Sequence, residues 1–332
     1  MADSPVLPSG ALALTALALA LGYLALAWLR ARMIDATGRV VLVTGCDSGI
    51  GLETCRLFAR VPGLSVVAAC RTEAGRRVLL TECEGAPAHV VGCLCDVTQP
   101  RDVDACVALA ASLGRGQLHA LINNAGVNGG SFVEWTSLEE YRRVMEVNFF
   151  GAVAMTKATL PLLRAARGRL VNLSSVTAIE GAGTLPTISA YAASKHALEA
   201  FSRCLRAECA GIGVHVITIN PGFTATALIQ GTPAVAEQLW AALSDEEKEG
   251  AWSSRFAAAY FRRARLAARL VAWPPHGVAR AVVQATLACW PRRRYWPSPD
   301  ALAVFYPLMF APDWLVDTLL AAPVTVFMPS RY

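Results

Sequence analysis

The sequence predicts an α/β fold in which a doubly wound parallel sheet forms a single domain, preceded by an N-terminal transmembrane helix. Three observations support this prediction. Short runs rich in β-branched residues alternate with longer stretches of helical periodicity, which is typical of strands that pair in parallel through crossover helices. A glycine-rich turn links the first such run to the helix that follows it. Ahead of both lies a long apolar segment without charges.

Six runs are expected to form buried strands, because each is short, apolar and bounded by turn-forming residues. They are residues 39–45, 64–70, 88–96, 119–126, 168–175 and 214–222. Helices are expected between them, notably over 138–163 and 189–210. Ligands of such sheets bind beyond the carboxyl ends of the strands, so the residues that follow each run are the candidates for a site.

The composition argues against two kinds of site. Charged residues make up only 17% of the chain, and its net charge of +5 is scattered, so we expect no nucleic-acid partner. The ten cysteines contain no C-x-x-C pair, which argues against a zinc site. Buried free thiols and no metal site are therefore expected.

The apolar segment at the N-terminus, residues 11–29, has nineteen residues without a charge and could cross a bilayer as a helix. A cleaved signal peptide is the alternative. Signal peptides carry positive charge before the apolar core, whereas here Asp3 precedes it and Arg30 and Arg32 follow it. We therefore expect residues 1–33 to form an uncleaved anchor, with the arginine side and the rest of the chain in the cytosol.

The end of the chain, residues 291–332, is an apolar tail. Its stretch over 301–328 is interrupted by Pro307, Pro312 and Pro323, so it cannot be one clean membrane span. An amphipathic segment at the membrane surface and ordinary packing against the domain both fit this pattern.

The turn after the first expected strand reads TGCDSGIG, with glycines in a G-x-x-x-G-x-G spacing. Glycines let the backbone approach a pyrophosphate, and the following helix N-terminus supplies free N–H groups and a positive dipole. The position of the turn between a strand and an amphipathic helix supports a dinucleotide site. We expect the cofactor to contact Gly45, Ser48, Gly49, Ile50 and Gly51.

The choice between NAD and NADP is usually made at the end of the second strand. An acid there binds the ribose hydroxyls of NAD, whereas a cation accepts the extra phosphate of NADP. No acid ends this strand and Arg71 follows it directly, which favours NADP, although Glu73 could still reach the ribose. Further cofactor contacts are expected after the third and fourth strands, at Asp96, Val97, Asn124, Ala125 and Gly126.

Tyr191 and Lys195 stand four residues apart at the start of an expected helix, with only small residues between them. They share one face of that helix and are close enough to interact. A nearby cation favours the phenolate and lowers the pKa of a tyrosine toward the range useful in acid–base catalysis. The chain has three lysines among thirty Lys and Arg residues, so chance rarely produces this spacing.

Other polar residues accompany the pair. Ser174 and Ser175 end the fifth expected strand, where a hydroxyl can hydrogen-bond a substrate oxygen, although serine also favours turns for its own sake. Asn148 stands in mid-helix among apolar neighbours. A buried amide must be satisfied, so a specific role is favoured for it.

In their order along the chain, these motifs resemble those of the short-chain dehydrogenase/reductase superfamily. The shared motifs are TGxxxGIG, NNAG, the asparagine helix, the paired serines, YxxxK and the PG after the sixth strand. The resemblance covers residues 38–290, which we expect to form a Rossmann-like catalytic domain. The local sequences TGCDSGIG, 145–172 and PRRRYWP are similar to the branch that contains hydroxysteroid, retinol and D-3-hydroxybutyrate dehydrogenases.

The resemblance implies that Asn148, Ser175, Tyr191 and Lys195 are a catalytic tetrad, the family using the second serine of such a pair. Tyr191 would exchange the alcohol proton while Ser175 polarises the oxygen. Lys195 would lower the pKa of the tyrosine and hold the nicotinamide ribose, and Asn148 would fix a water that feeds protons to the lysine. The cofactor carboxamide would meet Pro221, Gly222 and Thr224.

Two departures from the family pattern matter. Ser175 and Tyr191 are sixteen residues apart, more than is usual, so the substrate loop around 184–188 differs. Relatives that use NAD carry an apolar or acidic residue where this chain has Arg71. The resemblance therefore favours NAD while Arg71 favours NADP, and both cofactors stay open.

The insertion after the sixth strand, residues 225–272, is the substrate lid in the family, and its apolar content suits a lipophilic alcohol.

We predict a membrane-anchored NAD(P)-dependent oxidoreductase that interconverts an alcohol and its ketone or aldehyde on a hydroxysteroid or retinol. The alternatives are a 3-hydroxybutyrate-type dehydrogenase of a small hydroxy acid and a catalytically silent nucleotide-binding protein. A sugar-nucleotide epimerase would share YxxxK but would carry a different glycine spacing.

We also expect a homodimer at the endoplasmic reticulum membrane, with the catalytic domain in the cytosol. The lumenal face of that membrane and a mitochondrial membrane are the alternative locations.

Overall fold

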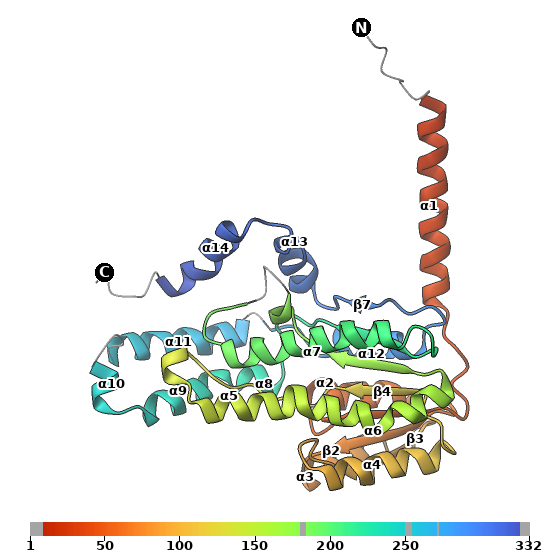
Figure 1. The fold of residues 1–332 in the computed structure, drawn as a ribbon, viewed down its shortest axis with the longest axis horizontal. Helices are drawn as coiled ribbons and strands as arrows, with labels where there is room; N and C mark the ends of the chain where they lie inside the picture. Colours follow the sequence, from red (N-terminus) through yellow and green to blue (C-terminus); the bar gives the residue numbers. More distant parts are fainter. Residues whose placement is uncertain (1–8, 180–183, 250–253, 271, 326–332) are drawn as a thin grey trace.

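The computed structural model describes residues 9–179, 184–249, 254–270 and 272–325. Its centre is a seven-stranded parallel sheet in the order β3-β2-β1-β4-β5-β6-β7 (Figure 1). The strands are β1 (Val40–Thr44), β2 (Ser65–Cys70), β3 (His89–Leu94), β4 (Ala120–Asn123), β5 (Arg169–Leu173), β6 (His215–Ile219) and β7 (Arg294–Tyr295). The chain reverses its direction of winding between β1 and β4, which is where such sheets bind ligands.

The first six strands confirm the sequence prediction, and burial explains why their pattern was readable. Every residue of β1, β4 and β5 is buried, so these strands are mainly apolar runs instead of alternating ones. In the register, Val41 lies between Val66 of β2 and Ala120 of β4. The seventh strand was not predicted because two residues are too short to show a pattern.

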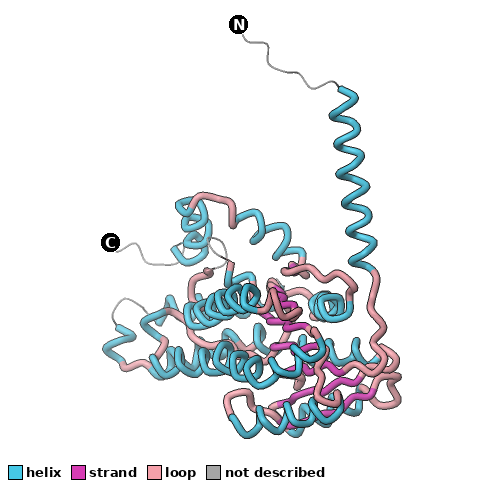
Figure 2. The backbone as a smooth tube through the Cα atoms, turned by 45° about the vertical axis from the view of Figure 1, so that its right-hand side comes forward, coloured by secondary structure: helices cyan, strands magenta, loops and turns pink. Residues whose placement is uncertain are grey.

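Helices cover both faces of the sheet, as Figure 2 shows. One core contains side chains from α2 (Gly49–Ala59), α3 (Glu73–Glu82) and α12 (His276–Leu287). The other contains side chains from α4 (Pro100–Leu113), α6 (Gly151–Ala166) and α7 (Ser189–Glu208). This double covering confirms the doubly wound arrangement.

The expected helix over 138–163 is not continuous. It consists of α5 (Leu138–Met145), the π-helical turn η2 (Glu146–Phe150) and α6, which follow one another directly. A π turn inserts one extra residue into the helical ladder and occurs frequently at functional sites. Two 3-10 turns, η1 (Val133–Trp135) and η3 (Val176–Ala178), follow β4 and β5.

The described residues of the insertion between β6 and α12 form four helices. They are α8 (Ala227–Gln230), α9 (Thr232–Ala242), α10 (Asp245–Glu249) and α11 (Ser254–Leu270). Aromatic packing attaches this insertion to the loop after β4, because Phe132 contacts Tyr260 with ring centres 5.2 Å apart and Trp135 contacts Trp240 at 4.9 Å. The role of the insertion as a lid stays a prediction.

The C-terminal part contains η4 (Ala301–Phe305), α13 (Tyr306–Leu308) and α14 (Asp313–Thr325). Ala301 and Phe305 pack on Val176 and Ile179 beyond β5. Ordinary packing therefore explains the start of the apolar tail. The side chains of Phe310 and Trp314 are nevertheless 72% and 69% exposed.

The N-terminal segment forms one helix, α1 (Ser9–Ala31), which projects away from the domain in Figures 1 and 2. Its end is attached by an antiparallel bridge: the N–H of Cys289 donates to the carbonyl of Arg32, and the N–H of Ile34 to that of Leu287. Among the described residues, no helix is both long and apolar enough to cross a membrane.

All ten cysteines are free, and most are buried, whereas Cys204 and Cys289 are exposed.

Candidate active site

The phosphate loop joins β1 to α2 at the carboxyl edge of the sheet. Gly45 has φ +70° and Gly49 has φ +59°, conformations that L side chains rarely adopt. A Cβ on Gly45 would lie 2.7 Å from the Cα of Ala125, and one on Gly51 would collide with the carbonyl of Gly45. The first N–H groups of α2 have no helical acceptor, and within the described chain the Ser48 side chain makes no capping bond to them. The loop is thus built to receive an anion.

The NNAG motif after β4 holds this loop in place. The Asn124 amide donates to the carbonyls of Thr44 and Gly45, at 2.8 and 3.0 Å. The Thr44 hydroxyl accepts from the backbone N–H groups of Asn124 and Ala125, both at 3.0 Å. Of the three residues predicted here, Asn124 and Gly126 line the pocket that also contains Tyr191 and Lys195. Asn124 and Ala125 also have a supporting role that the motif alone did not reveal.

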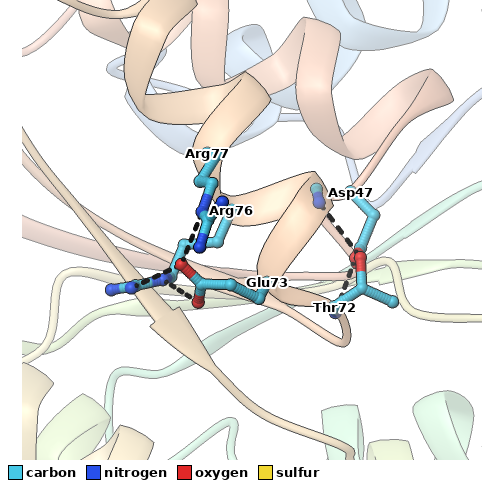
Figure 3. A network of polar contacts seen from close by, with 6 residues as sticks. Asp47, Thr72, Glu73, Arg76 and Arg77 are labelled. Atoms are coloured by element: carbon cyan, nitrogen blue, oxygen red, sulfur yellow. Dashed lines mark hydrogen bonds and ion pairs between the residues drawn. The ribbon is translucent and has the colours of Figure 1, made fainter.

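No residue of β2 is acidic, as the sequence shows, but a carboxylate from another segment lies at the end of this strand. Asp47, from the phosphate loop, lies against the backbone there and accepts hydrogen bonds from the N–H groups of Arg71 and Thr72, each at 2.8 Å. Figure 3 shows Asp47 beside Thr72. The sequence could not show this because Asp47 and Thr72 are twenty-five residues apart. The Arg71 side chain is exposed.

Beyond β3, the carboxylate of Asp96 closes a local turn by accepting from the backbone N–H and the hydroxyl of Thr98, at 2.9 and 2.7 Å. Val97 is buried. A Cβ on Gly151 at the start of α6 would lie 2.6 Å from the Cγ2 of Val97. The structure therefore gives both residues a local packing or turn function, and their contact with the cofactor stays a prediction.

Helix α7 brings Tyr191 and Lys195 into the pocket from successive turns. The Lys195 side chain is only 4% exposed, and its Nζ donates to the carbonyl of Leu173 at 2.9 Å. The ammonium lies 5.7 Å from the centre of the Tyr191 ring. Ser175, just past β5, hydrogen-bonds the Tyr191 side chain. Three predicted residues from two elements therefore converge at the carboxyl edge of the sheet.

Burial dominates the protonation of this group. It raises the pKa of Tyr191 to about 12, although the hydrogen bond with Ser175 acts in the opposite direction. It also lowers the pKa of Lys195 to about 8. The pKa of Tyr191 is therefore above its usual value in this arrangement, because the effect of burial is larger than that of the hydrogen bond with Ser175.

Asn148, the fourth predicted residue, lies in the π turn η2 and is buried. Its Oδ1 accepts from the backbone N–H of Val127 at 2.8 Å, and its Nδ2 donates to the carbonyl of Val127 and the Ser194 hydroxyl, both at 3.0 Å. A Cβ on Gly126 would lie 3.2 Å from this Oδ1 and 3.6 Å from the Nζ of Lys195. The glycine thus leaves an open space between the asparagine and the lysine.

Residues 39–235 match the short chain dehydrogenase family. The chain is 35% identical over 289 residues to retinol dehydrogenase 16 of Mus musculus, covering 85% of this chain and 87% of that protein.

This chain is a short-chain dehydrogenase.

Other relatives place it in the retinol and hydroxysteroid dehydrogenase branch of the superfamily, as the motifs predicted. It is 34% identical over 293 residues to dehydrogenase/reductase SDR family member 9 of Homo sapiens, covering 86% and 88% of the two chains. It is 32% identical over 312 residues to 17-beta-hydroxysteroid dehydrogenase type 6 of Bos taurus, covering 92% and 95%. The fold matches a short chain dehydrogenase/reductase from Burkholderia phymatum, solved in complex with NAD, with a TM-score of 0.67, 24% identity and coverage of 82% and 94%.

Short-chain dehydrogenases bind NAD(P), and the residues of this chain fit such a cofactor. The glycine cradle and the free end of α2 suit its pyrophosphate. Pro221, Gly222 and Thr224, predicted to meet the carboxamide, line the same pocket as Tyr191 and Lys195. When bound, the nicotinamide accepts or supplies the hydride.

Two residues that the sequence motifs did not reveal shape the loop after β6. The Ser298 hydroxyl accepts from the N–H of Gly222 at 2.8 Å, and the Asp300 carboxylate accepts from the N–H of Phe223 at 2.8 Å. A Cβ on Gly222 would overlap the Asp300 carboxylate. Their signal was weak, because a serine and an aspartate on either side of Pro299 predict a turn but not the partner of that turn.

The two candidate serines differ in their bonding. Ser175 contacts Tyr191 and accepts from the N–H of Thr177 at 3.1 Å. The Ser174 hydroxyl is buried and has no hydrogen-bond partner in the described part of the chain, although the residue also lines the pocket. The geometry thus supports the choice of Ser175 as the partner of the tyrosine.

The pocket of this short-chain dehydrogenase is mainly apolar beyond Tyr191. The loop after β5, the loop after β6 and the helices α8 and α11 contribute Leu185, Pro186, Ile188, Phe223, Leu228, Ile229, Ala264 and Ala268. Lys195 is the only charged side chain among the described residues that line it. The predicted loop at 184–188 therefore reaches the pocket, while its neighbours at 180–183 lie outside the described residues.

Proposed function

We propose that this short-chain dehydrogenase interconverts a lipophilic secondary or allylic alcohol, a hydroxysteroid or a retinol, with its ketone or aldehyde, using NAD(P). The observation that carries the proposal is an apolar pocket with Tyr191, Ser175 and Lys195 at one end. The names of the relatives, retinol dehydrogenase 16 and 17-beta-hydroxysteroid dehydrogenase type 6, support the same substrate class.

In this proposal Tyr191 exchanges a proton with the substrate oxygen, and Ser175 holds that oxygen through its hydroxyl. The neutral phenol that burial favours can donate a proton during carbonyl reduction. Lys195 stabilises the phenolate that forms and holds the nicotinamide ribose. The space beside Gly126 lets a water join Asn148, whose Oδ1 has a second lone pair, to the lysine.

A small hydroxy acid of the 3-hydroxybutyrate type is the weaker candidate. A carboxylate removed from water needs a charged or multiply hydrogen-bonded partner. Among the described lining residues, Lys195 is the only cation, and its Nζ already donates to the carbonyl of Leu173. An apolar substrate body fits the remaining lining better.

The deciding experiment measures NADH or NADPH formation with the full-length protein and a panel of hydroxysteroids, all-trans-retinol and 3-hydroxybutyrate. We expect turnover of a steroid or retinol and little with the hydroxy acid. Turnover of 3-hydroxybutyrate alone would overturn the substrate class, and binding of cofactor without turnover of any alcohol in the panel would favour a silent protein.

A substitution in α11 tests where the substrate binds. Ala264 faces the pocket from α11, so Ala264→Phe should raise the KM for a steroid or retinol by about tenfold while a short alcohol is less affected. The matched control is Leu266→Phe, since Leu266 is 56% exposed on the same helix. Equal effects of both substitutions would contradict the proposed position of the substrate.

We also propose that α1 attaches the enzyme to the endoplasmic reticulum membrane, with the domain on the cytosolic side. The exposed apolar side chains of α1 support attachment, because Leu14, Leu24 and Trp28 are each at least 60% exposed. Arg30 in its last turn supports the orientation. A homodimer is proposed as the assembly; light scattering of the detergent-solubilised protein would test it.

A further inference from the structure

We propose that Cys93 and Cys106 form a peroxide-reactive dithiol, in which Cys93 is oxidised first and Cys106 then closes a reversible disulfide. The site lies between the edge strand β3 and the helix α4. Neither cysteine is among the described residues that line the pocket, and the proposal is independent of the alcohol chemistry.

The two sulfur atoms already lie close to each other. The Sγ atoms of Cys93 and Cys106 are 3.3 Å apart and share a hydrogen bond. An S–S bond is about 2.0 Å long, so these atoms need to approach each other by only about 1.3 Å. Side chains alternate along a strand, which explains why Cys93 and Cys95 both point toward α4 and both contact Cys106. Figure 1 shows α4 alongside β3 at this edge of the sheet.

Of these three thiols, Cys93 is the one that solvent can reach. The strand β3 is the outermost strand of the sheet, and each of its residues is at least partly exposed. Cys93 is partly exposed there, whereas the side chains of Cys106 and Cys95 are only 1% and 4% exposed. A small, uncharged oxidant such as hydrogen peroxide therefore meets Cys93 first, with Cys106 directly behind it.

The neighbours of Cys93 favour its reactive form. The pKa of Cys93 lies below its usual value, because Cys106 donates a hydrogen bond to its sulfur. Burial opposes this effect, and Arg76, which is paired with Glu73, adds a smaller effect in the same direction as the hydrogen bond. The pKa of Cys106 is raised far above its usual value, first by its hydrogen bond with Cys93, so Cys106 keeps its proton. Because the thiolate is the nucleophile, Cys93 is the attacking sulfur and Cys106 the resolving one.

The reaction balances with hydrogen peroxide as its one co-reactant. The Cys93 thiolate attacks a peroxide oxygen: the S–O bond forms, the O–O bond breaks, and hydroxide leaves and takes up the proton that the thiol released. Cys93 is then a sulfenic acid, without the charge that held the proton on Cys106.

In the second step the Cys106 sulfur attacks the Cys93 sulfur. The S–S bond forms, the S–O bond breaks, and the hydroxyl group leaves as water with the proton of Cys106. Two thiols are thus oxidised to one disulfide while one peroxide is reduced to two water molecules. A thiol such as glutathione reverses the reaction by exchange.

A second pair of thiols provides a comparison within the same molecule. The Sγ atoms of Cys46 and Cys55 lie 3.5 Å apart, almost as close as those of the proposed site. Both side chains are 0% exposed, and burial raises the pKa of Cys46 well above its usual value. A short distance alone therefore does not make a thiol reactive, and we expect this buried pair to stay reduced while the proposed site is oxidised.

The test exposes the folded, full-length protein briefly to hydrogen peroxide, without cofactor or alcohol, and then blocks the remaining thiols with N-ethylmaleimide in denaturant. Trypsin cleaves after Arg101, so a disulfide between Cys93 and Cys106 joins the peptides 78–101 and 102–115. Mass spectrometry identifies the joined peptides, and their fragmentation assigns the bond to individual cysteines.

We expect this cross-link to form at least about tenfold faster than a bond between Cys46 and Cys55, and dithiothreitol to reverse it. Cys93→Ser should abolish the cross-link. Cys106→Ser should stop the reaction at the sulfenic acid, which dimedone labels at Cys93. Cys204→Ser, at an exposed thiol of α7, is the matched control and should leave the rate unchanged.

Three results would overturn the proposal. They are maleimide on both Cys93 and Cys106 after oxidation, a bond from Cys106 to Cys95 in place of Cys93, and a bond between the fully buried thiols that forms equally fast. All three are measured on the unmodified protein, so they do not depend on how the variants fold. Alcohol turnover is a separate measurement, so failure of this proposal and failure of the proposed function are distinguishable.

Discussion

At the scale of single residues, the proposed chemistry depends on a phenol that burial keeps protonated. Tyr191 is enclosed with Ser175 and Lys195, and burial keeps its pKa well above the ordinary value. Such a group is ready to donate a proton to a carbonyl oxygen. In the opposite direction, alcohol oxidation requires the phenolate, which only the lysine charge and bound ligands can make accessible.

Tyr191→Phe removes the phenolic hydroxyl group and its proton but keeps the aromatic ring. We expect turnover to fall by about 100- to 10,000-fold in both directions, the usual contribution of a general acid–base group. NADH affinity should change little, which calorimetry can measure. Tyr141→Phe is the control, because the hydroxyl of Tyr141 bonds to Ser189 at 2.5 Å and does not line the pocket. Unchanged turnover in Tyr191→Phe would remove the tyrosine from the mechanism.

The two shifted pKa values also predict a pH profile for alcohol oxidation. The active pair is a phenolate with an ammonium. Below about pH 8 the lysine is charged, and the phenolate fraction rises about tenfold per pH unit because the tyrosine pKa is about 12. Above pH 8 the loss of the lysine charge cancels this rise. We expect kcat/KM to rise up to about pH 8 and then level; a decline between pH 6 and 8 would contradict the assignment.

At the scale of elements, the strands and helices with a regular local sequence pattern were predicted correctly from the sequence. The six long strands and α7 with its Tyr191 and Lys195 pair were all readable, because burial and helical spacing act within a few residues. The π turn around Asn148 was not, since apolar spacing does not distinguish a π turn from an α turn. Asp47 and Asp300 were missed because their partners lie far along the chain.

Gly126 lies where β4, η2 and α7 meet, and its lack of a side chain leaves a space between Asn148 and Lys195. Gly126→Ala would place a Cβ 3.2 Å from the Oδ1 of Asn148 and 3.6 Å from the Nζ of Lys195, inside the space between them. We expect kcat to fall by about tenfold or more, because small misplacements of catalytic groups are costly. Stability should change little. Gly211→Ala is the control, since its Cβ would meet nothing within 4 Å; equal kcat values would show that the space is unused.

At the scale of the whole molecule, the two ends of the chain relate differently to the domain. The sheet and its covering helices build the pocket, and the start of the C-terminal part supports it, since Ser298 and Asp300 bind the loop after β6. The N-terminal helix is joined to the domain at its exit, where residues 32–34 pair with 287–289. Catalysis and membrane attachment should therefore be separable by truncation.

Deletion of residues 1–31 tests this separation, because it keeps the pairing between Arg32 and Cys289. We expect Tm to change by less than about 2 °C, as for other changes outside the packed core. Cofactor affinity should also be kept, whereas the protein should move from the membrane pellet to the supernatant after alkaline extraction. The full-length chain is the control. Retention of the truncated protein in the pellet would instead assign attachment to the exposed Phe310 and Trp314 of the C-terminal part.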